Sequence, residues 1–87
     1  MYYVYLLRSK ETGKIYTGYT HNLRRRVNEH FSQNVYTTHR MGNIELIYYE
    51  AFLNKIDAKN REEYLKSGWG LRSIKKLLKR YLSGEVA

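Results

Sequence analysis

The stretch "IYTGYTHNLRRRVNEH", residues 15–30, contains the junction that decides the fold. Its first five residues are rich in Tyr and β-branched side chains, which predicts a strand that stops near Gly18, where the backbone can approach another group closely. Thr20 or Asn22 then offers a side-chain oxygen to a free backbone N–H, which predicts a cap and a helix over residues 23–31. The junction therefore brings three consecutive arginines and a histidine directly behind a tyrosine-rich strand.

A hairpin is expected to include this strand. The residues "YYVYLLRS" at 2–9 are typical of a strand, and Gly13 suits a turn position with positive φ. Residues 2–19 are therefore expected to form two antiparallel strands joined by a short turn.

Further elements follow the first helix. The apolar residues of "IELIYYEAF" at 44–52 fall on both alternations of a strand, so we expect both faces of the sheet to be covered. Residues 32–43 have turn composition and are expected to form a loop. A second helix is predicted within residues 54–68, with Gly68 as the residue that follows its end.

The C-terminal segment "LRSIKKLLKRYL", residues 71–82, is predicted to form a last helix with one apolar stripe. The stripe consists of Leu71, Ile74, Leu77, Leu78, Tyr81 and Leu82. The resulting order, β-β-α-β-α-α, predicts an α+β fold: a small three-stranded antiparallel sheet flanked by helices, within a single domain over residues 1–87.

The composition excludes several kinds of site. The 87 residues contain no cysteine, so disulfides, iron–sulfur clusters and thiolate zinc sites are excluded, and a reducing compartment, the cytoplasm, is expected. The longest apolar run, residues 1–7, is too short to span a bilayer. Ten of the thirteen aromatic residues are Tyr, whose hydroxyl is useful where packing meets a wet site.

The net charge indicates the kind of partner. Sixteen Lys and Arg oppose eight Asp and Glu, which gives +8 at pH 7 and favours DNA, RNA or an anionic membrane surface. A solvated basic helix face is the plainer interpretation, but two basic clusters in separate parts of the chain favour nucleic acid. The residues expected to contact it are Arg24, Arg25, Lys66, Arg72, Lys75 and Lys76.

The three arginines of the first helix point in different directions. A helix turns about 100° per residue, so with Leu23 at zero, Val27 lies at about +40° and Phe31 at about +80°. These three residues form the expected buried stripe. Arg25, at about 200° on the same wheel, faces water.

Arg26 and His30 instead border the buried stripe. On the same wheel Arg26 lies at about −60° and His30 at about −20°, so the two form an i, i+4 pair on one flank of the helix. A surface ion pair of Arg26 and a satisfied buried histidine are the plain alternatives to a functional site.

The same calculation separates two acids of the second helix. With Ala58 at zero, Leu65 lies at about −20°, Glu62 at about +40° and Glu63 at about 140°. Glu62 therefore shares the inward face. A carboxylate there needs a partner. An ion pair with an arginine such as Arg26, or a hard divalent cation, would each meet that need.

These motifs resemble the GIY-YIG nuclease superfamily, and in particular its small stand-alone bacterial members. The resemblance rests on "YVYLLRS" at 3–9, "YTG" at 16–18, "TGYTHNLRRRVNEH" at 17–30 and "AKNREEYLKSGWG" at 58–70. It covers nearly the whole chain, from about residue 2 to residue 78. Each motif alone is weakly specific, but four in order with the right spacing are strong evidence together.

The resemblance implies a catalytic site. It implies that Tyr5, Tyr16, Arg26 and His30 are catalytic and that Glu62 binds one divalent cation, Mg²⁺ or Mn²⁺. The helical-wheel angles independently separate Arg26 from Arg25 and Glu62 from Glu63. One departure is Tyr3, which stands where the family's first motif usually begins with glycine.

The implied activity is metal-dependent hydrolysis of phosphodiesters in DNA, including structured or branched DNA, or in RNA, with DNA as the preferred expectation. A non-catalytic nucleic-acid-binding module that uses the same basic surface is the main alternative, and attachment to a membrane surface through the last helix is the weaker one. We expect no membrane partner. We expect a monomer or weak homodimer that takes its specificity from a protein partner.

Overall fold

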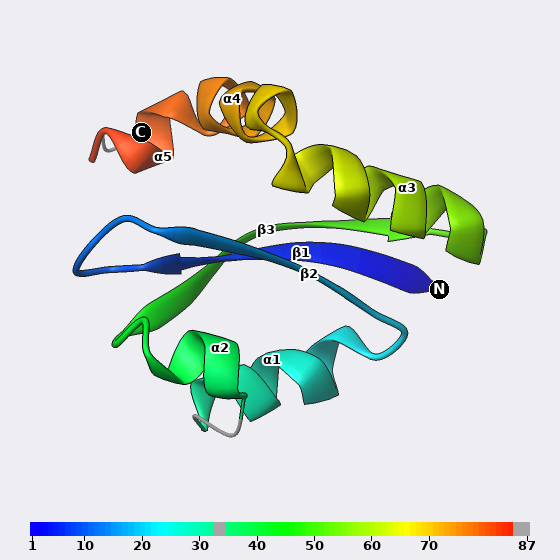
Figure 1. The fold of residues 1–87 in the computed structure, drawn as a ribbon, viewed down its shortest axis with the longest axis horizontal. Coiled ribbons are helices and arrows are strands. Elements are labelled where there is room, and N and C mark those ends of the chain that lie inside the picture. Colours follow the sequence, from blue (N-terminus) through cyan, green and yellow to red (C-terminus); the bar gives the residue numbers. More distant parts are fainter. Residues whose placement is uncertain (33–34, 85–87) are drawn as a thin grey trace.

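The computed structural model describes residues 1–32 and 35–84 and has an α+β architecture (Figure 1). Its elements, in chain order, are β1 (Tyr2–Ser9), β2 (Ile15–Thr20), α1 (Leu23–Phe31), α2 (Tyr36–His39), β3 (Ile44–Phe52), α3 (Lys55–Lys66), α4 (Gly68–Leu77) and α5 (Lys79–Leu82). The three strands form an antiparallel sheet in the order β2-β1-β3, with α1 and α2 on one face and α3, α4 and α5 on the other. The predicted fold class is confirmed.

The strand register assigns each side chain of β1 to one of these two faces. Tyr5 lies opposite Gly18 of β2 and Tyr49 of β3, whereas Val4 lies opposite Tyr19 and Glu50. Because side chains alternate along a strand, odd-numbered residues of β1 point towards α1 and even-numbered ones towards α3. Each face of this one central strand therefore belongs to a different layer of the molecule.

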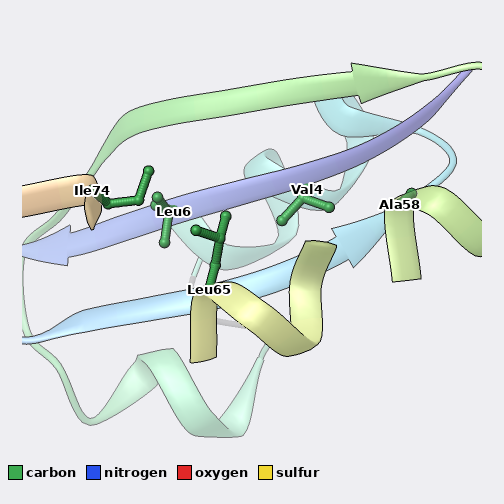
Figure 2. Close-up of a cluster of buried hydrophobic side chains, with 5 residues drawn as sticks. All are labelled: Val4, Leu6, Ala58, Leu65 and Ile74. Atoms are coloured by element: carbon green, nitrogen blue, oxygen red, sulfur yellow. The ribbon is translucent and has the colours of Figure 1, made fainter. Parts of the chain in front are cut away.

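The apolar core lies between the sheet and α3–α4 (Figure 2). It is built from Val4 and Leu6 of β1 with Ala58, Leu65 and Ile74 of the helices, all of which are buried. The face towards α1 has a different character, because His30, Thr38 and Ser9 are buried there together with Tyr5. The fold thus keeps an apolar core on one side of the sheet, whereas the layer on the other side, called the polar layer below, buries these polar groups beside Leu7 and Val27.

The junction between α3 and α4 differs from the prediction. Gly68 does not follow a helix end with positive φ but begins α4, and Ser67 separates the two helices with an extended backbone (φ −76°, ψ 162°). The Ser67 hydroxyl accepts a hydrogen bond from the Gly70 N–H at 3.1 Å, so one residue ends α3 and caps α4. A Cβ at Gly70 would overlap the Tyr64 carbonyl group, which explains the glycine at this close approach.

Other expectations also need correction. Residues 32–43 were expected to form a loop but include the single turn of α2, and the last predicted helix breaks at Leu78 into α4 and α5. Leu77 and Tyr81 of the predicted apolar stripe are exposed, as is Phe31 of α1. In α1, His30 takes the buried place that the prediction gave to Phe31.

Within residues 1–32 and 35–84, no helix combines the length and the apolar character needed to cross a membrane.

Candidate active site

A buried pair, Tyr5 and His30, forms the centre of the polar layer. The Tyr5 hydroxyl oxygen lies 2.8 Å from Nε2 of His30, and each residue is 1% exposed. The Tyr5 ring lies against the backbone of Gly18, where a Cβ would overlap both the ring and the phenol oxygen. The glycine of the strand-to-helix junction is therefore needed for the position of this tyrosine.

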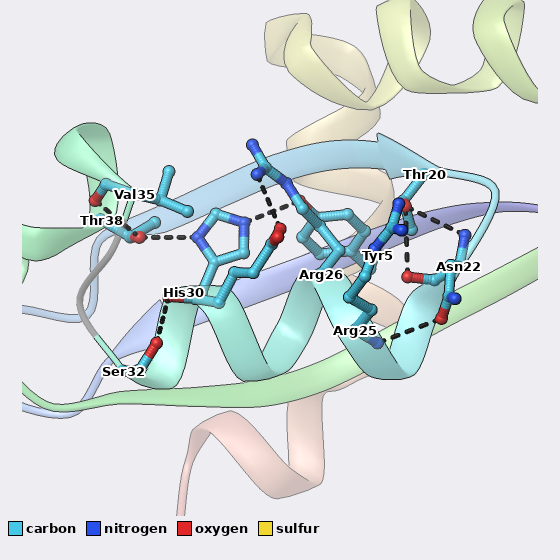
Figure 3. A network of polar contacts seen from close by, with 10 residues as sticks. Tyr5, Thr20, Asn22, Arg25, Arg26, His30, Ser32, Val35 and Thr38 are labelled. Carbon is cyan, nitrogen blue, oxygen red and sulfur yellow. Dashed lines mark hydrogen bonds and ion pairs between the residues drawn. The ribbon is translucent and has the colours of Figure 1, made fainter.

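His30 is held from its other nitrogen by a threonine. Nδ1 lies 2.6 Å from Oγ1 of Thr38 in α2, and the Thr38 hydroxyl donates to the Val35 carbonyl at 3.5 Å (Figure 3). We infer that Thr38 accepts a hydrogen bond from the Nδ1–H of His30, because the Val35 carbonyl offers an acceptor for the one proton of the Thr38 hydroxyl. Nε2 then has a free lone pair and accepts from the Tyr5 O–H. This assignment of the tautomer follows from the network of partners.

Burial sets the protonation of both residues. Burial, together with the positive charge of the nearby Arg26 guanidinium, lowers the pKa of His30 to about 4. Burial, together with the neighbouring Tyr16, raises the pKa of Tyr5 to about 12 and outweighs the opposing effect of Arg26. At neutral pH the site of the free protein therefore holds a neutral phenol beside a neutral imidazole.

Arg26 and Tyr16 complete a four-residue cluster. The Tyr16 ring centre lies 5.3 Å from that of His30 and 6.4 Å from that of Tyr5. Arg26 donates to Glu29 at 3.1 Å, which raises the pKa of Arg26, and it also interacts with the Tyr5 phenol. The structure thus brings together the four residues that were predicted to be catalytic.

Arg24 and Arg25 belong to a different surface. Both are exposed, and they line a shallow groove of about 550 Å³ along the outer side of α1. The Arg25 backbone N–H donates to the Asn22 side chain at 3.1 Å, which identifies Asn22 as the cap that begins α1. Arg25 is exposed, as predicted, whereas Arg26 is only partly exposed on the flank of the helix that borders the buried stripe.

Glu62 lies in the layer on the other side of the sheet. Its side chain is 16% exposed, and its carboxylate pairs with Lys66 one turn later at 3.1 Å. Since Arg26 pairs instead with Glu29, the alternative of an ion pair between Glu62 and Arg26 is wrong.

The direction of Glu62 follows from its neighbours on α3. The Lys59 ammonium lies 4.4 Å from the Tyr19 ring of β2, whereas Arg61 donates to Glu50 of β3 at 2.8 Å. One flank of α3 thus faces β2 and the other faces β3. Glu62 follows Lys59 by three residues and therefore lies on the β2 flank.

The carboxylate of Glu62 fits a cation that is shared with a substrate. In the described part of the chain, no group of three or more His, Cys, Asp or Glu residues could hold a metal ion. Mg²⁺ normally keeps several waters and is bound through one or two carboxylates together with substrate phosphates. A single, partly buried carboxylate meets that requirement only when a phosphate completes the coordination.

The basic residues of α4 lie on two flanks. Arg72 and Lys76 line one hollow together with Trp69, and Lys75 lines another beside Arg8 of β1. Lys66, at the end of α3, pairs with Glu62. The predicted nucleic-acid contacts are therefore spread over several surfaces.

Thr38 is the site residue that the sequence did not reveal. It falls in a segment that was predicted to be a loop, and none of its neighbours indicates that a hydroxyl there faces a histidine eight residues earlier. A buried histidine usually needs a partner for its second ring nitrogen, and only this general rule could have indicated that such a residue exists.

Comparisons with known proteins identify the family of this chain. The GIY-YIG catalytic domain family matches residues 1–70. A UPF0213 protein of Clostridium perfringens is 40% identical over 67 residues, 76% of this chain and 71% of its own length, and one of Oceanobacillus iheyensis is 36% identical over 66 residues, 75% and 76% of the two chains. The solution NMR structure of a UPF0213 protein of Bacillus halodurans is similar with a TM-score of 0.55 and 35% identity, over 88% of this chain and 85% of that one. By its strands, its tyrosine and arginine motifs and these relatives, the chain belongs to the GIY-YIG family.

Proposed function

We propose that this protein is a metal-dependent endonuclease that hydrolyses phosphodiester bonds, in DNA rather than RNA. The convergence of Tyr5, Tyr16, Arg26 and His30 beside Gly18 is the observation that carries the proposal. It unites a cation for a phosphate, two phenols and an imidazole that can accept a proton. The cytoplasm is the compartment that we expect.

Arg26 binds the scissile phosphate in this proposal. Its planar guanidinium donates two parallel hydrogen bonds to a phosphodiester, and its side chain is 37% exposed, so a substrate can reach it. The phosphate competes with Glu29 for the guanidinium. An incoming anion also offsets the positive charge that lowers the pKa of His30.

Tyr5 relays a proton rather than acting as a phenolate. With its pKa raised to about 12 it is protonated at rest, and its O–H already points to Nε2 of His30. As a water molecule attacks phosphorus, one water proton moves to the Tyr5 oxygen while the phenol proton moves to Nε2. The P–O bond to the leaving oxygen then breaks, and that oxygen takes a proton from solvent. Tyr16 assists by orienting the water.

Glu62 holds the divalent cation in this proposal. Its place on the β2 flank of α3 supports the assignment. The Tyr5 ring lies against Gly18 of the same strand, on the opposite face of the sheet. The edge of β2 is where groups from both layers can reach one phosphate. When bound, Mg²⁺ or Mn²⁺ supplies stabilisation of negative charge on the phosphate and the leaving oxygen.

Cleavage assays with matched variants test the proposal. Purified protein with Mg²⁺ or Mn²⁺ is offered branched, flapped and single-stranded DNA and RNA. We expect Tyr5→Phe, Arg26→Ala and Glu62→Gln each to lower cleavage at least about 100-fold. The adjacent control Glu63→Gln should cleave within a few-fold of the parent protein, and Arg25→Ala, which removes an expected nucleic-acid contact outside the cluster, should lower cleavage far less than Arg26→Ala.

Absence of product with every substrate, or equal cleavage by Glu62→Gln and Glu63→Gln, would overturn the catalytic proposal. In that case the exposed cations of α1 and α4 favour the second candidate, a module that binds nucleic acid without cutting it. Such a module would bind without a metal ion, and its affinity would fall steeply with salt.

A further inference from the structure

Trp69 stands exposed on the layer opposite the tyrosine–histidine cluster. It lies near the start of α4 and is 72% exposed, although it is the largest apolar side chain in the protein. The Arg72 guanidinium lies 4.8 Å from the centre of its ring system. Tyr64 of α3 is 42% exposed beside it. Apart from the contact with Arg72, the fold leaves most of this flat ring system exposed.

These side chains line a hollow. Tyr64, Trp69, Arg72, Ser73 and Lys76 surround about 330 Å³, and we call it the tryptophan hollow. None of the five is acidic, and the sequence contains no Asp or Glu between residues 64 and 84. The hollow therefore combines an aromatic wall with two cations.

This combination selects among ligands. The cations favour a polyanion, and the flat indole favours a flat ring that can lie against it. An acidic peptide supplies the charge but no planar ring at each residue. A duplex supplies the charge but keeps its bases stacked inside. An unpaired nucleotide supplies both, a base for the indole and a phosphate for the cations.

We propose that the tryptophan hollow binds an unpaired, single-stranded segment of nucleic acid. One base stacks on Trp69, and the adjacent phosphate is held by Arg72 and Lys76. Binding there requires no metal ion and none of the four clustered residues. Its consequence for substrate choice, a preference for DNA with an unpaired strand, rests on the proposed nuclease function.

The other flank of α4 offers a control of equal charge. Lys75 and Lys79 line a separate hollow beside Arg8 and Gly13, with no aromatic residue in its lining. Removing two charges from either flank changes the long-range field equally. Any difference between the two flanks therefore reports on local contact rather than on net charge.

Fluorescence provides a direct readout, since Trp69 is the sole tryptophan among the 87 residues. The protein is titrated with oligothymidylate in EDTA, with excitation at the red edge of absorption, where tyrosine does not absorb. We expect saturable quenching of Trp69 by the single strand. A duplex of the same length should quench much less at the same concentration.

The variants sharpen the test. Trp69→Ala, monitored by anisotropy of a labelled oligothymidylate, should weaken binding about ten- to hundredfold, whereas Trp69→Phe should retain most of the affinity. Arg72→Gln with Lys76→Gln should weaken binding more than Lys75→Gln with Lys79→Gln. Thermal unfolding checks that each variant is folded.

Equal quenching by duplex and single strand, or unchanged affinity of Trp69→Ala, would overturn this proposal. So would a change of Trp69 emission with protein concentration alone, which would indicate that a second copy of the chain covers the hollow. None of these results bears on cleavage. The titration uses EDTA, and the parallel assay with Glu62→Gln tests the nuclease proposal separately.

Discussion

Thr38 favours one tautomer of His30, the one in which Nδ1 carries the proton and Nε2 is free to accept from Tyr5. Its hydroxyl accepts the Nδ1–H bond and leaves the lone pair of Nε2 for the phenol. Without that acceptor, the imidazole would gain by moving its proton to Nε2, where it would turn a donor towards the donor of Tyr5. A residue that does not contact the substrate would thus decide the direction of the proton relay.

We therefore predict that Thr38→Val slows cleavage and destabilises the fold by about 1–3 kcal/mol, because a buried polar atom of His30 loses its partner. Thr38→Ser keeps the hydroxyl and should restore both properties. Nitrogen NMR of the imidazole ring is the decisive measurement. It should show the Nδ1–H form in the parent protein and Thr38→Ser, but not in Thr38→Val. Cleavage and tautomer that are the same in all three proteins would refute the relay.

The depressed pKa of His30 makes stability depend on pH. The imidazole binds its proton near pH 6.5 in the unfolded chain but only near pH 4 in the folded protein. Between these values the unfolded state holds more protons, so stability rises with pH in this window. As the pH falls from 6.5 to 4, we expect the free energy of unfolding to drop by at most about 3 kcal/mol.

Proton NMR of the His30 ring measures that titration directly. Urea unfolding at several pH values measures its effect on stability. A ring that titrates near pH 6.5 in the folded protein would contradict the prediction. Such a result would indicate that water reaches the imidazole of His30.

At the scale of elements, the β2–α1 junction depends on a glycine without positive φ. Gly18 is needed because the Tyr5 ring lies where its Cβ would be, not because the backbone is unusual. The junction therefore couples the path of β2 to the position of Tyr5, which we propose to be catalytic. The need for glycine at position 18 is steric, so a smaller side chain in place of Tyr5 should remove it.

Gly18→Ala is predicted to destabilise the protein by about 1–3 kcal/mol and to abolish cleavage by displacing the phenol. Gly68→Ala is the matched control, since nothing lies within 4 Å of a Cβ there and its φ is not positive. That control should change stability by less than about 1 kcal/mol. In a double-mutant cycle measured by urea unfolding, Gly18→Ala should cost less when Tyr5 is already Ala. Strict additivity would show that the clash is not the cause.

Over the whole molecule, sequence patterns within a few residues predicted more of the structure than did features that depend on contacts between distant elements. The strands and α1 follow from β-branched and aromatic runs and from the Asn22 cap, which act within a few residues. The place of Arg26 on the flank beside the buried stripe and the partly buried place of Glu62 follow from helix periodicity alone. These features could be read from the sequence because neighbours along the chain decide them.

What could not be predicted depends on contacts between distant elements. His30, and not Phe31, takes the buried position on α1, and its partner there is Tyr5, which lies 25 residues away in the sequence. Gly68 begins a helix because Ser67 caps α4, which the glycine signal alone does not indicate. The approach of α3 to the edge of β2 likewise depends on the packing of the whole α3–α4 layer.

The charge and the single carboxylate together predict how the molecule responds to chelation. The described residues contain no cluster of ligands that would store a cation, so EDTA should leave the melting temperature of the free protein unchanged while it abolishes cleavage. Calorimetry should detect Mn²⁺ binding to the free protein only at millimolar concentrations. A non-cleavable phosphorothioate substrate should raise that affinity at least about tenfold, because phosphate oxygens complete the coordination. Glu62→Gln should remove this gain, and Glu63→Gln should not. A melting temperature that falls in EDTA would instead indicate a structural metal ion and would refute the shared site.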